Sequence, residues 1–356
     1  MGDTTRQLNL LPRPRRAELD PRGTAAAGAP QTHRDHTVPA QGYRIRLTED
    51  TITIDAADAT GEFYANATLA QLRRLQDPVP TGVIEDWPDL ATRGVMLDVS
   101  RDKVPTMETL EALIDRLAGW KINQLQLYIE HTFAYTDHRE VWADASPFTA
   151  DEIRALDRFC ADRHVELVPN QNSLGHMERW LRHDRYRHLA IQPEGRTSQS
   201  GRWRPPTTLD PSNPGSLALV ADLLRELLPC FTSNRIHLGL DEPWELPPER
   251  FDDYLAYGRQ LRDLPEAADR EILIWGDIIG GHQDAASQLP DGVTVCEWGY
   301  EQWWPFESRA RILAAARRPF WLCPGTSSWL SVLGRVTNAI GNCHAAAANA
   351  INHGAA

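Results

Sequence analysis

Seven short apolar runs recur after Leu90, and most are separated from the next by a stretch with helical periodicity. The runs are RGVMLDVS (93–100), NQLQLYIE (123–130), VELVPNQN (165–172), RIHLGLDE (235–242), EILIWGD (271–277), VTVCEWGY (293–300) and FWLCPG (320–325). The helical stretches are 106–120, 149–163, 216–229 and 308–318. Continuously apolar strands that alternate with helices predict a parallel sheet covered by helices. Because polar and aromatic residues follow most runs, we expect an α/β fold of the (β/α)8 TIM-barrel type.

The last run is followed by a helix-like stretch, 337–352, and by no eighth apolar run. A closed barrel needs an eighth strand, because otherwise its first and seventh strands keep unpaired edges. The sequence therefore predicts a TIM-barrel domain at 89–356 that lacks the eighth strand and is truncated at its C-terminal end.

A small α+β domain is expected to precede the barrel, at residues 1–88. Alternating apolar and polar residues predict strands at 42–50 and 51–58, and apolar spacing predicts a helix at 61–76. Another strand is predicted at 81–86. Residues 1–40 are rich in Pro, Gly, Ala and Arg with little periodicity, so we expect them to be loosely structured.

Composition narrows the classes of partner. A net charge of −12 argues against nucleic acid and anionic membranes. No secretory h-region or membrane-spanning apolar run is visible, and the five cysteines are scattered without a CxxC pair, which favours a cytoplasmic protein. Neither H-x-H nor H-E-x-x-H occurs, and we expect no metal and no cofactor.

The twelve tryptophans fit sugar stacking or core packing equally well, and the oligomeric state is left open.

The fourth apolar run ends in the adjacent acids Asp241 and Glu242, with Trp244 two residues later. Neighbouring carboxylates repel, which favours a retained proton on one of them, as a general acid requires. A solvated acidic pair after a strand is the alternative. A two-carboxylate retaining glycosidase needs a second acid about 5 Å away.

The seventh run, where many barrel glycosidases carry that second acid, continues as CPGTSSW without one. Acids at the other strand ends form no obvious pair with Glu242; they are Glu130, Asp277, Glu297 and Glu301. The missing nucleophile favours a substrate that supplies its own.

Several of these segments resemble family 20 glycoside hydrolases, the β-N-acetylhexosaminidases. RGVMLDVSRDKVP resembles the family's first-strand motif, and HLGLDE resembles its H-x-G-x-D-E motif. LVPNQNSLGHMERW resembles the third-strand segment ending in Gly-His, in the form of the hexosaminidase D-like branch. The segment from Tyr43 to Leu72 resembles the family's small N-terminal domain.

The resemblance implies a retaining exo-β-N-acetylhexosaminidase acting on terminal β-linked N-acetylhexosamine. The substrate's acetamido carbonyl would attack the anomeric carbon and give an oxazolinium intermediate. Glu242 would protonate the leaving oxygen and then activate water, Asp241 would orient the acetamido group, and His176 would support the acid's protonation cycle. The choice between GlcNAc and GalNAc, the aglycone and the glycan length stay open.

The resemblance also implies residues that bind the substrate. Arg93 matches an arginine that binds two sugar hydroxyls, for which its planar fork is suited; a salt bridge at the base of the barrel is the alternative. The remaining implied contacts are aromatic walls or hydrogen-bonding groups at strand ends: Trp275, Trp298, Asp277, Tyr300, Trp329 and Trp244. Asp98 and Arg101 are taken as structural partners within the first-strand motif.

The chain departs from the family pattern in three places. The Tyr-x-Asp that usually contacts the acetamido oxygen is missing near Trp329. Amides at 170–172 replace acids before the Gly-His, and we expect Glu130 or His131 to restore the lost charge. The eighth-strand tryptophan is missing, so we expect this chain alone to be poorly stable or nearly inactive.

Two other classes are left open by the sequence. A catalytically impaired carbohydrate-binding member of the family would keep the tryptophans and lose turnover. A metal-dependent barrel hydrolase would need several converging ligands, which the sequence does not provide.

Overall fold

The structure is a computed structural model that describes residues 9–101, 103–197, 201–280, 284–329 and 331–356. Its contacts divide the chain into two compact units. Unit 1 contains residues 1–94 together with 108–124 and 159–165, and unit 2 contains 95–107, 125–158 and 166–356.

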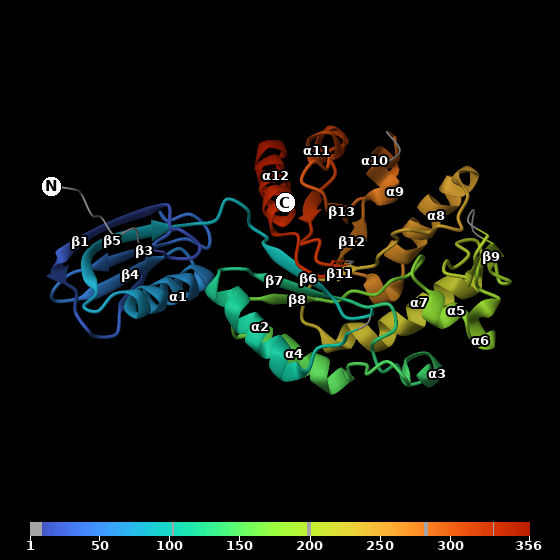
Figure 1. Ribbon diagram of the computed structural model, residues 1–356, viewed down its shortest axis with the longest axis horizontal. Helices are drawn as coiled ribbons and strands as arrows, with labels where there is room; N and C mark the ends of the chain where they lie inside the picture. Colours follow the sequence, from blue (N-terminus) through green and yellow to red (C-terminus); the bar gives the residue numbers. More distant parts are fainter. Residues whose placement is uncertain (1–8, 102, 198–200, 281–283, 330) are drawn as a thin grey trace. The chain divides into compact units, whose positions relative to one another are not determined.

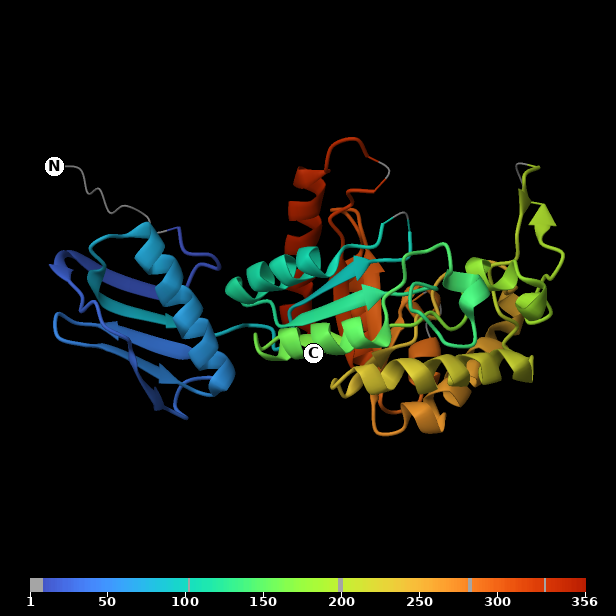
Figure 2. The ribbon, with the colours of Figure 1, turned by 90° about the horizontal axis from the view of Figure 1, so that it is seen from below.

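Unit 1 is built on a five-stranded sheet in the order β1-β5-β3-β4-β2. The strands are β1 (Arg16–Thr24), β2 (Gln31–Arg34), β3 (Tyr43–Leu47), β4 (Ile52–Ala56) and β5 (Pro80–Asp86). The strands pair antiparallel except for β2, which runs parallel to β4. Helix α1 (Ala59–Leu75) lies along one face, as Figure 2 shows. The core between them contains Ile45, Ile54, Tyr64 and Leu69, all buried.

The strands predicted at 42–50, 51–58 and 81–86 and the helix predicted at 61–76 are confirmed. The expectation that residues 1–40 are loosely structured is wrong for β1 and β2. Both are mostly exposed strands at the two edges of the sheet, so they carry no apolar alternation that a sequence pattern could reveal. β1 also contains Pro21 and Gly23 and changes register after Asp20, as edge strands tolerate.

Seven strands follow, and they correspond to the seven apolar runs. They are β6 (Gly94–Asp98), β7 (Gln124–Tyr128), β8 (Glu166–Val168), β11 (Arg235–His237), β12 (Glu271–Trp275), β13 (Val293–Gly299) and β14 (Phe320–Pro324). One sheet has the order β6-β7-β8, and a second, parallel sheet has the order β11-β12-β13-β14. A parallel bridge between Asn170 and His237 joins the end of β8 to β11. Among the described residues no eighth strand joins β14 to β6.

Helices and short strands fill the connections, and Figure 1 shows α11 and α12 side by side. The helices are α2 (Met107–Gly119), α3 (Arg139–Trp142), α4 (Ala150–Ala161), α5 (Glu178–Leu181), α6 (Asp184–Arg187), α7 (Pro214–Leu227), α8 (Phe251–Arg262), α9 (Asp277–Gly280), α10 (Ala285–Gln288), α11 (Phe306–Ala315) and α12 (Val336–His353). A small antiparallel pair consists of β9 (Arg196–Thr197) and β10 (Trp203–Arg204), and three 3-10 turns lie at Leu228–Cys230, Pro248–Arg250 and Pro265–Ala267. Within the described part of the chain, no helix has both the length and the apolar character needed to cross a membrane.

The inner side of the unit 2 strands forms one apolar cluster. Tyr128, Val168, Leu273, Trp275 and Cys296 are its buried members. They come from four strands, with Leu273 and Trp275 both on β12 and one residue each on β7, β8 and β13. Because the strands share one direction in the second sheet, the residues that follow β11, β12 and β13 emerge at the same edge.

Asp58 caps α1, and its removal should weaken unit 1. One carboxylate oxygen accepts the Gly61 N–H at 2.8 Å and the other accepts the Gln41 N–H at 2.7 Å. We expect Asp58→Ala to lower the free energy of unfolding by about 1 to 2 kcal/mol, measured by urea unfolding and by hydrogen exchange of the α1 amides. Asp58→Asn is the control and should cost less, since asparagine is an equally good cap. An alanine variant as stable as the native chain would show that the cap is dispensable.

Candidate active site

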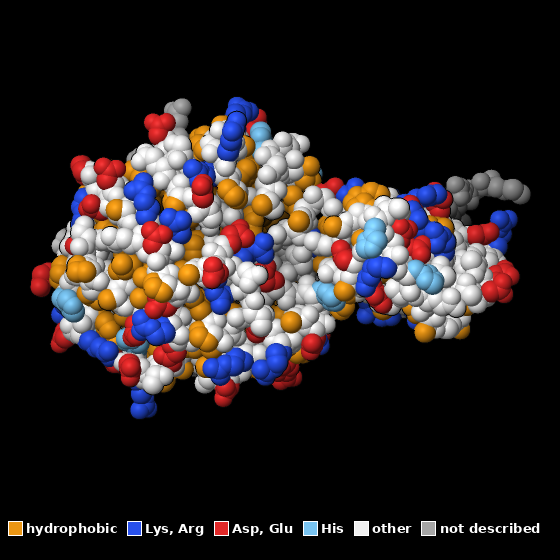
Figure 3. Space-filling model, turned by 180° about the vertical axis from the view of Figure 1, so that it is seen from behind, with side chains coloured by type: hydrophobic (Ala, Val, Ile, Leu, Met, Phe, Trp, Pro, Cys, Tyr) orange, Lys and Arg blue, Asp and Glu red, His pale blue; other side chains and the backbone are white. Residues whose placement is uncertain are grey.

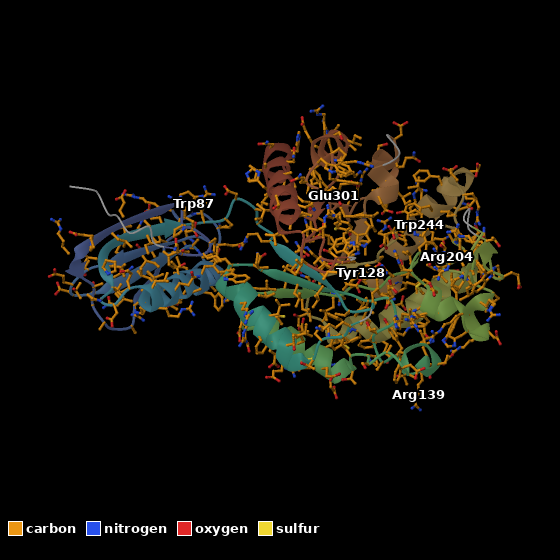
Figure 4. All side chains as sticks on the ribbon, in the orientation of Figure 1. Trp87, Tyr128, Arg139, Arg204, Trp244 and Glu301 are labelled. Atoms are coloured by element: carbon orange, nitrogen blue, oxygen red, sulfur yellow. The ribbon has the colours of Figure 1, made fainter. Side chains whose placement is uncertain are left out.

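The side chains at the carboxyl ends of β7, β8 and β11 converge on His176. Its Nε2 lies 3.2 Å from Asp241 Oδ2 and 3.2 Å from Glu242 Oε2. Its Nδ1 lies 3.5 Å from Glu130 Oε1 and 3.1 Å from Arg101 Nη2. One imidazole therefore contacts three carboxylates and one guanidinium. Tyr128, at the end of β7, and Trp244, just beyond Glu242, are labelled in Figure 4.

The backbone at this point is held in unusual conformations. His176, Leu240 and Glu242 have positive φ angles of 59°, 67° and 46°, which side chains other than glycine seldom adopt. Gly175 must be glycine, because a Cβ there would lie 2.1 Å from the carbonyl oxygen of Asp241. Such strain is retained where the surrounding structure fixes it and is common at active sites.

Asp241 is buried and only partly satisfied. The Tyr128 hydroxyl donates to Oδ2 at 3.1 Å, whereas Oδ1 is buried and has no hydrogen-bond partner among the described residues. The side chain of Glu242 is more exposed, at 28% against 10% for Asp241. A buried carboxylate oxygen without a donor is suited to accept an N–H or O–H from a bound molecule.

Asp277 supports Glu242 through the main chain. Its Oδ2 accepts the Glu242 N–H at 3.0 Å, and its Oδ1 accepts from Trp298 Nε1 at 3.4 Å. Burial raises the pKa of Asp277 to about 6; the negative charge of Asp241 adds to this, while the Glu242 N–H opposes it. The carboxylate is therefore used within the protein rather than left free for a ligand.

The aromatic residues predicted at the strand ends separate into three groups. Trp298, Tyr300 and Trp329 form one continuous cluster, with ring centroids 4.9 Å apart for the first pair and 4.7 Å for the second. Trp275 is 8% exposed and packs in the inner apolar cluster, 4.5 Å from the ring of His237. Trp244 is 64% exposed and stands apart from both.

Within this aromatic cluster, Tyr300 carries a titratable hydroxyl whose pKa is affected by Asp241 and Glu242. Burial raises its pKa, and the charges of Asp241 and Glu242 add to the effect. The phenol therefore lies within electrostatic range of the acidic pair, which connects the aromatic cluster to the carboxylates around His176.

The hydrogen bonds of Arg93 all go to groups of unit 1. Its Nε donates to the Lys121 carbonyl at 2.8 Å, its Nη1 to the Leu90 carbonyl at 2.7 Å, and its Nη2 to Tyr64 at 2.8 Å and Gln41 at 3.0 Å. All of these partners belong to unit 1, so the guanidinium is fully used there. Arg93 precedes β6, and the site-forming residues follow the carboxyl ends of strands.

Arg101, which the sequence analysis treated as a structural partner only, lies in the site. Its Nη1 donates to Asp98 at 2.8 Å, while its Nη2 lies 3.1 Å from Glu130 Oε1 and 3.3 Å from the Tyr128 hydroxyl. The side chain stays 50% exposed, so the guanidinium also faces outward. Its place after the carboxyl end of the first strand is the signal that could have identified it.

Of the two residues expected to restore the lost charge, the structure brings Glu130 to His176 and leaves His131 elsewhere. Burial raises the pKa of Glu130 to about 7, against the opposing charges of Arg101 and His176. Burial lowers the pKa of His131 to about 4, and the charges of Arg179 and Arg182 add to this.

The amides before the Gly-His contribute to packing. Gln171 accepts from the Tyr135 hydroxyl at 2.7 Å and donates to the Glu130 carbonyl at 3.2 Å. It therefore holds the end of β7 in place and has no free group for a sugar hydroxyl.

Two family models match this chain. Residues 91–317 match the glycosyl hydrolase family 20 catalytic domain, and residues 4–87 match the domain 2 of that family. A beta-hexosaminidase of Akkermansia muciniphila is 25% identical over 269 residues, which cover 69% of this chain and 54% of the relative. A beta-N-acetylhexosaminidase of Cellulomonas fimi is 25% identical over 295 residues, which cover 76% and 57%. The chain thus spans little more than half the length of these curated relatives.

Solved structures share the fold. A glycoside hydrolase family 20 β-N-acetylglucosaminidase superposes with a TM-score of 0.70 at 23% identity, covering 90% of this chain and 76% of the other. The Vibrio harveyi exo-β-N-acetylglucosaminidase, solved with N-acetylglucosamine, gives 0.69 at 20% identity, covering 85% and 52%. With the family match extending over most of the described residues, the chain belongs to glycosyl hydrolase family 20.

Proposed function

We propose that the chain is a retaining exo-β-N-acetylhexosaminidase that removes terminal β-linked N-acetylhexosamine with the help of the substrate's own acetamido group. The observation that carries this proposal is the position of His176 Nε2, 3.2 Å from both Asp241 and Glu242. A cation between two acids allows one to stay charged while the other exchanges a proton. Such a pair can stabilise a cationic intermediate and protonate a leaving group in one site.

In this mechanism Glu242, the more exposed acid, donates its proton to the leaving oxygen and then takes a proton from water. The buried Oδ1 of Asp241 accepts the acetamido N–H, and the Asp241 charge stabilises the oxazolinium ring that forms when the acetamido oxygen attacks. The other nearby carboxylates are occupied, Glu130 by Arg101 and His176 and Asp277 by the Glu242 main chain. This supports attack by the substrate amide rather than by a protein carboxylate.

Sugar binding is assigned to the neighbouring groups. The half-exposed guanidinium of Arg101 replaces Arg93 as the ligand of the sugar hydroxyls, because its fork faces the acids. Trp298, Tyr300 and Trp329 offer ring faces for stacking. Trp244, exposed and two residues after Glu242, offers a further ring face.

A neutral glycan agrees with the distribution of charge. On the face shown in Figure 3, acidic and basic side chains are interspersed and do not form a continuous basic band. Binding of a polyanion such as nucleic acid requires that kind of band. The co-solved N-acetylglucosamine in the Vibrio harveyi relative also favours an N-acetylhexosamine.

Replacement of either acid should abolish most turnover. We expect Glu242→Gln and Asp241→Asn each to reduce kcat on an aryl β-N-acetylglucosaminide at least roughly a hundredfold, since each loses an acid–base or charge-stabilising group. Glu301→Gln removes an exposed acid paired with Arg335 and serves as the matched control with a normal rate. Near-normal turnover by either active-site variant, or rapid cleavage of an aryl glucoside without an N-acetyl group, would falsify the mechanism.

The two arginines should differ in the kind of damage that their loss causes. Arg101→Gln should lower kcat/KM by about ten- to a hundredfold, the value of one charge-assisted hydrogen bond. Arg93→Gln should lower the Tm and leave kcat/KM of the folded enzyme nearly unchanged, because its bonds lie within unit 1. The reverse pattern in steady-state kinetics and thermal melts would restore Arg93 as the sugar ligand.

His176 should remain protonated well above neutral pH. Burial lowers its pKa, but the hydrogen bonds with Asp241 and Glu242 and the charge of Glu130 outweigh it and raise the pKa to about 10. NMR titration of the imidazole should therefore show no deprotonation near pH 6.5, and Glu130→Gln should lower the midpoint because one negative charge is lost. A midpoint near 6.5 in the native protein would contradict the charge arrangement.

A further inference from the structure

Glu297 is a buried acid that the mechanism above does not use. It lies on β13 with 1% of its side chain exposed, and neither of its oxygens has a hydrogen-bond partner among the described residues. The closest cation is Arg309 of α11, whose Nε is 3.7 Å from Oε1. A carboxylate that is buried without full satisfaction is costly, so its presence calls for a reason.

The carboxylate of Glu297 forms part of the surface on which α9 rests. A Cβ on Gly276 or on Gly280 would lie 2.8 Å from Glu297 Oε2. A Cβ on Gly280 would also lie 2.2 Å from Arg309 Nη1. Only glycine at both positions lets the α9 turn approach the acid and the guanidinium this closely.

That turn carries Asp277, which holds the main chain of the proposed general acid. Asp277 accepts the Glu242 N–H at 3.0 Å and the Trp298 indole N–H at 3.4 Å. Trp298 follows Glu297 directly on β13, and the glycines on either side of the Asp277 segment, Gly276 and Gly280, both approach Glu297 Oε2. A shift of the turn would move Glu242 relative to the leaving oxygen.

We propose that Glu297 and Arg309 form a positioning pair, which seats the α9 turn under Glu242 and sets the negative charge available beside it. The inference rests on the proposed function for its catalytic consequence. The electrostatic coupling among Glu297, Arg309 and Asp277 does not depend on the proposed function.

The charges around the pair define how it should titrate. Burial raises the pKa of Glu297 to about 7; the charge of Arg309 opposes this rise and the charge of Asp277 adds to it. Asp277 itself has a pKa of about 6 and faces Asp241, the Glu242 main chain, Trp298 and the phenol of Tyr254. As the pH rises, Asp277 therefore ionises first, and its charge delays the ionisation of Glu297.

The Trp298 indole N–H reports on this coupling without any need for activity. In the full-length chain, its NMR resonance should titrate in two overlapping steps, near pH 6 and near pH 7. Glu297→Gln should remove the upper step. Arg309→Met should move the upper step to higher pH, because Glu297 loses its counter-charge. Glu307→Gln, which removes an exposed acid of α11 paired with Arg311, should leave both steps in place.

Kinetics on an aryl β-N-acetylglucosaminide test the catalytic part. Glu297→Gln leaves the Arg309 charge uncompensated, so Glu242 should lose its proton more easily and the basic limb of the kcat profile should move to lower pH. We expect kcat to fall about tenfold with little change in KM, since the acid and not the sugar is displaced. The double variant Glu297→Gln/Arg309→Met lacks that uncompensated charge, so the basic limb of its kcat–pH profile should return toward the native position.

The outcomes separate the two proposals. A single titration step in the native protein, or a two-step titration that Glu297→Gln leaves intact, overturns the inference. The native titration decides this even if a variant does not fold. An absence of aryl glycoside turnover by the native chain contradicts the proposed function and leaves the NMR test valid. A Glu297→Gln variant with a lower Tm and an unchanged pH profile would make the pair merely structural.

Discussion

The candidate site depends on one imidazole placed among three carboxylates. Asp241, Glu242 and Glu130 all lie within 3.5 Å of His176 in a partly buried space, where like charges repel unless a cation lies between them. His176 supplies that cation from the third strand, and Arg101 supplies a second from the first. The carboxyl ends of β6, β7, β8 and β11 are thus joined by charge, at the edge where their hydrogen-bonded ladders have ended.

The tight backbone follows from the same arrangement. For Nε2 to reach both acids, the turn before His176 must pass directly against the turn at Asp241, which leaves no room for a side chain at Gly175. The positive φ angles of His176 and Glu242 result from this close approach. Strain of this kind is stable only when other groups fix the backbone, and Asp277 does so by holding the Glu242 N–H.

Local pattern was sufficient to predict the seven apolar strands, whereas the roles proposed for Asp241 and Glu242 came from the family resemblance. Strands of a helix-covered parallel sheet are apolar along their length, so the seven strands of unit 2's two larger sheets could be identified. The exposed edge strand β1 and the short pair β9–β10 could not. Arg93 and Arg101 occur in the same sequence motif. Arg93 precedes β6 and its guanidinium is held by groups of unit 1, whereas Arg101 follows β6 and its guanidinium lies among the acids. Glu130 was one of two adjacent candidates just beyond the end of β7, and only the three-dimensional structure separated it from His131.

The charges of the site also explain why its second layer is acidic. Asp277 and Glu297 are buried behind Glu242, where apolar residues would pack at lower cost. The charge of Asp241 raises the pKa of Asp277, and the charge of Asp277 raises that of Glu297, so these acids are electrostatically coupled. Arg309 offsets part of the negative charge of Glu297, since its Nε lies 3.7 Å from Oε1. Asp277 and Glu297 therefore contribute to the electrostatic field around Asp241 and Glu242 without belonging to that pair.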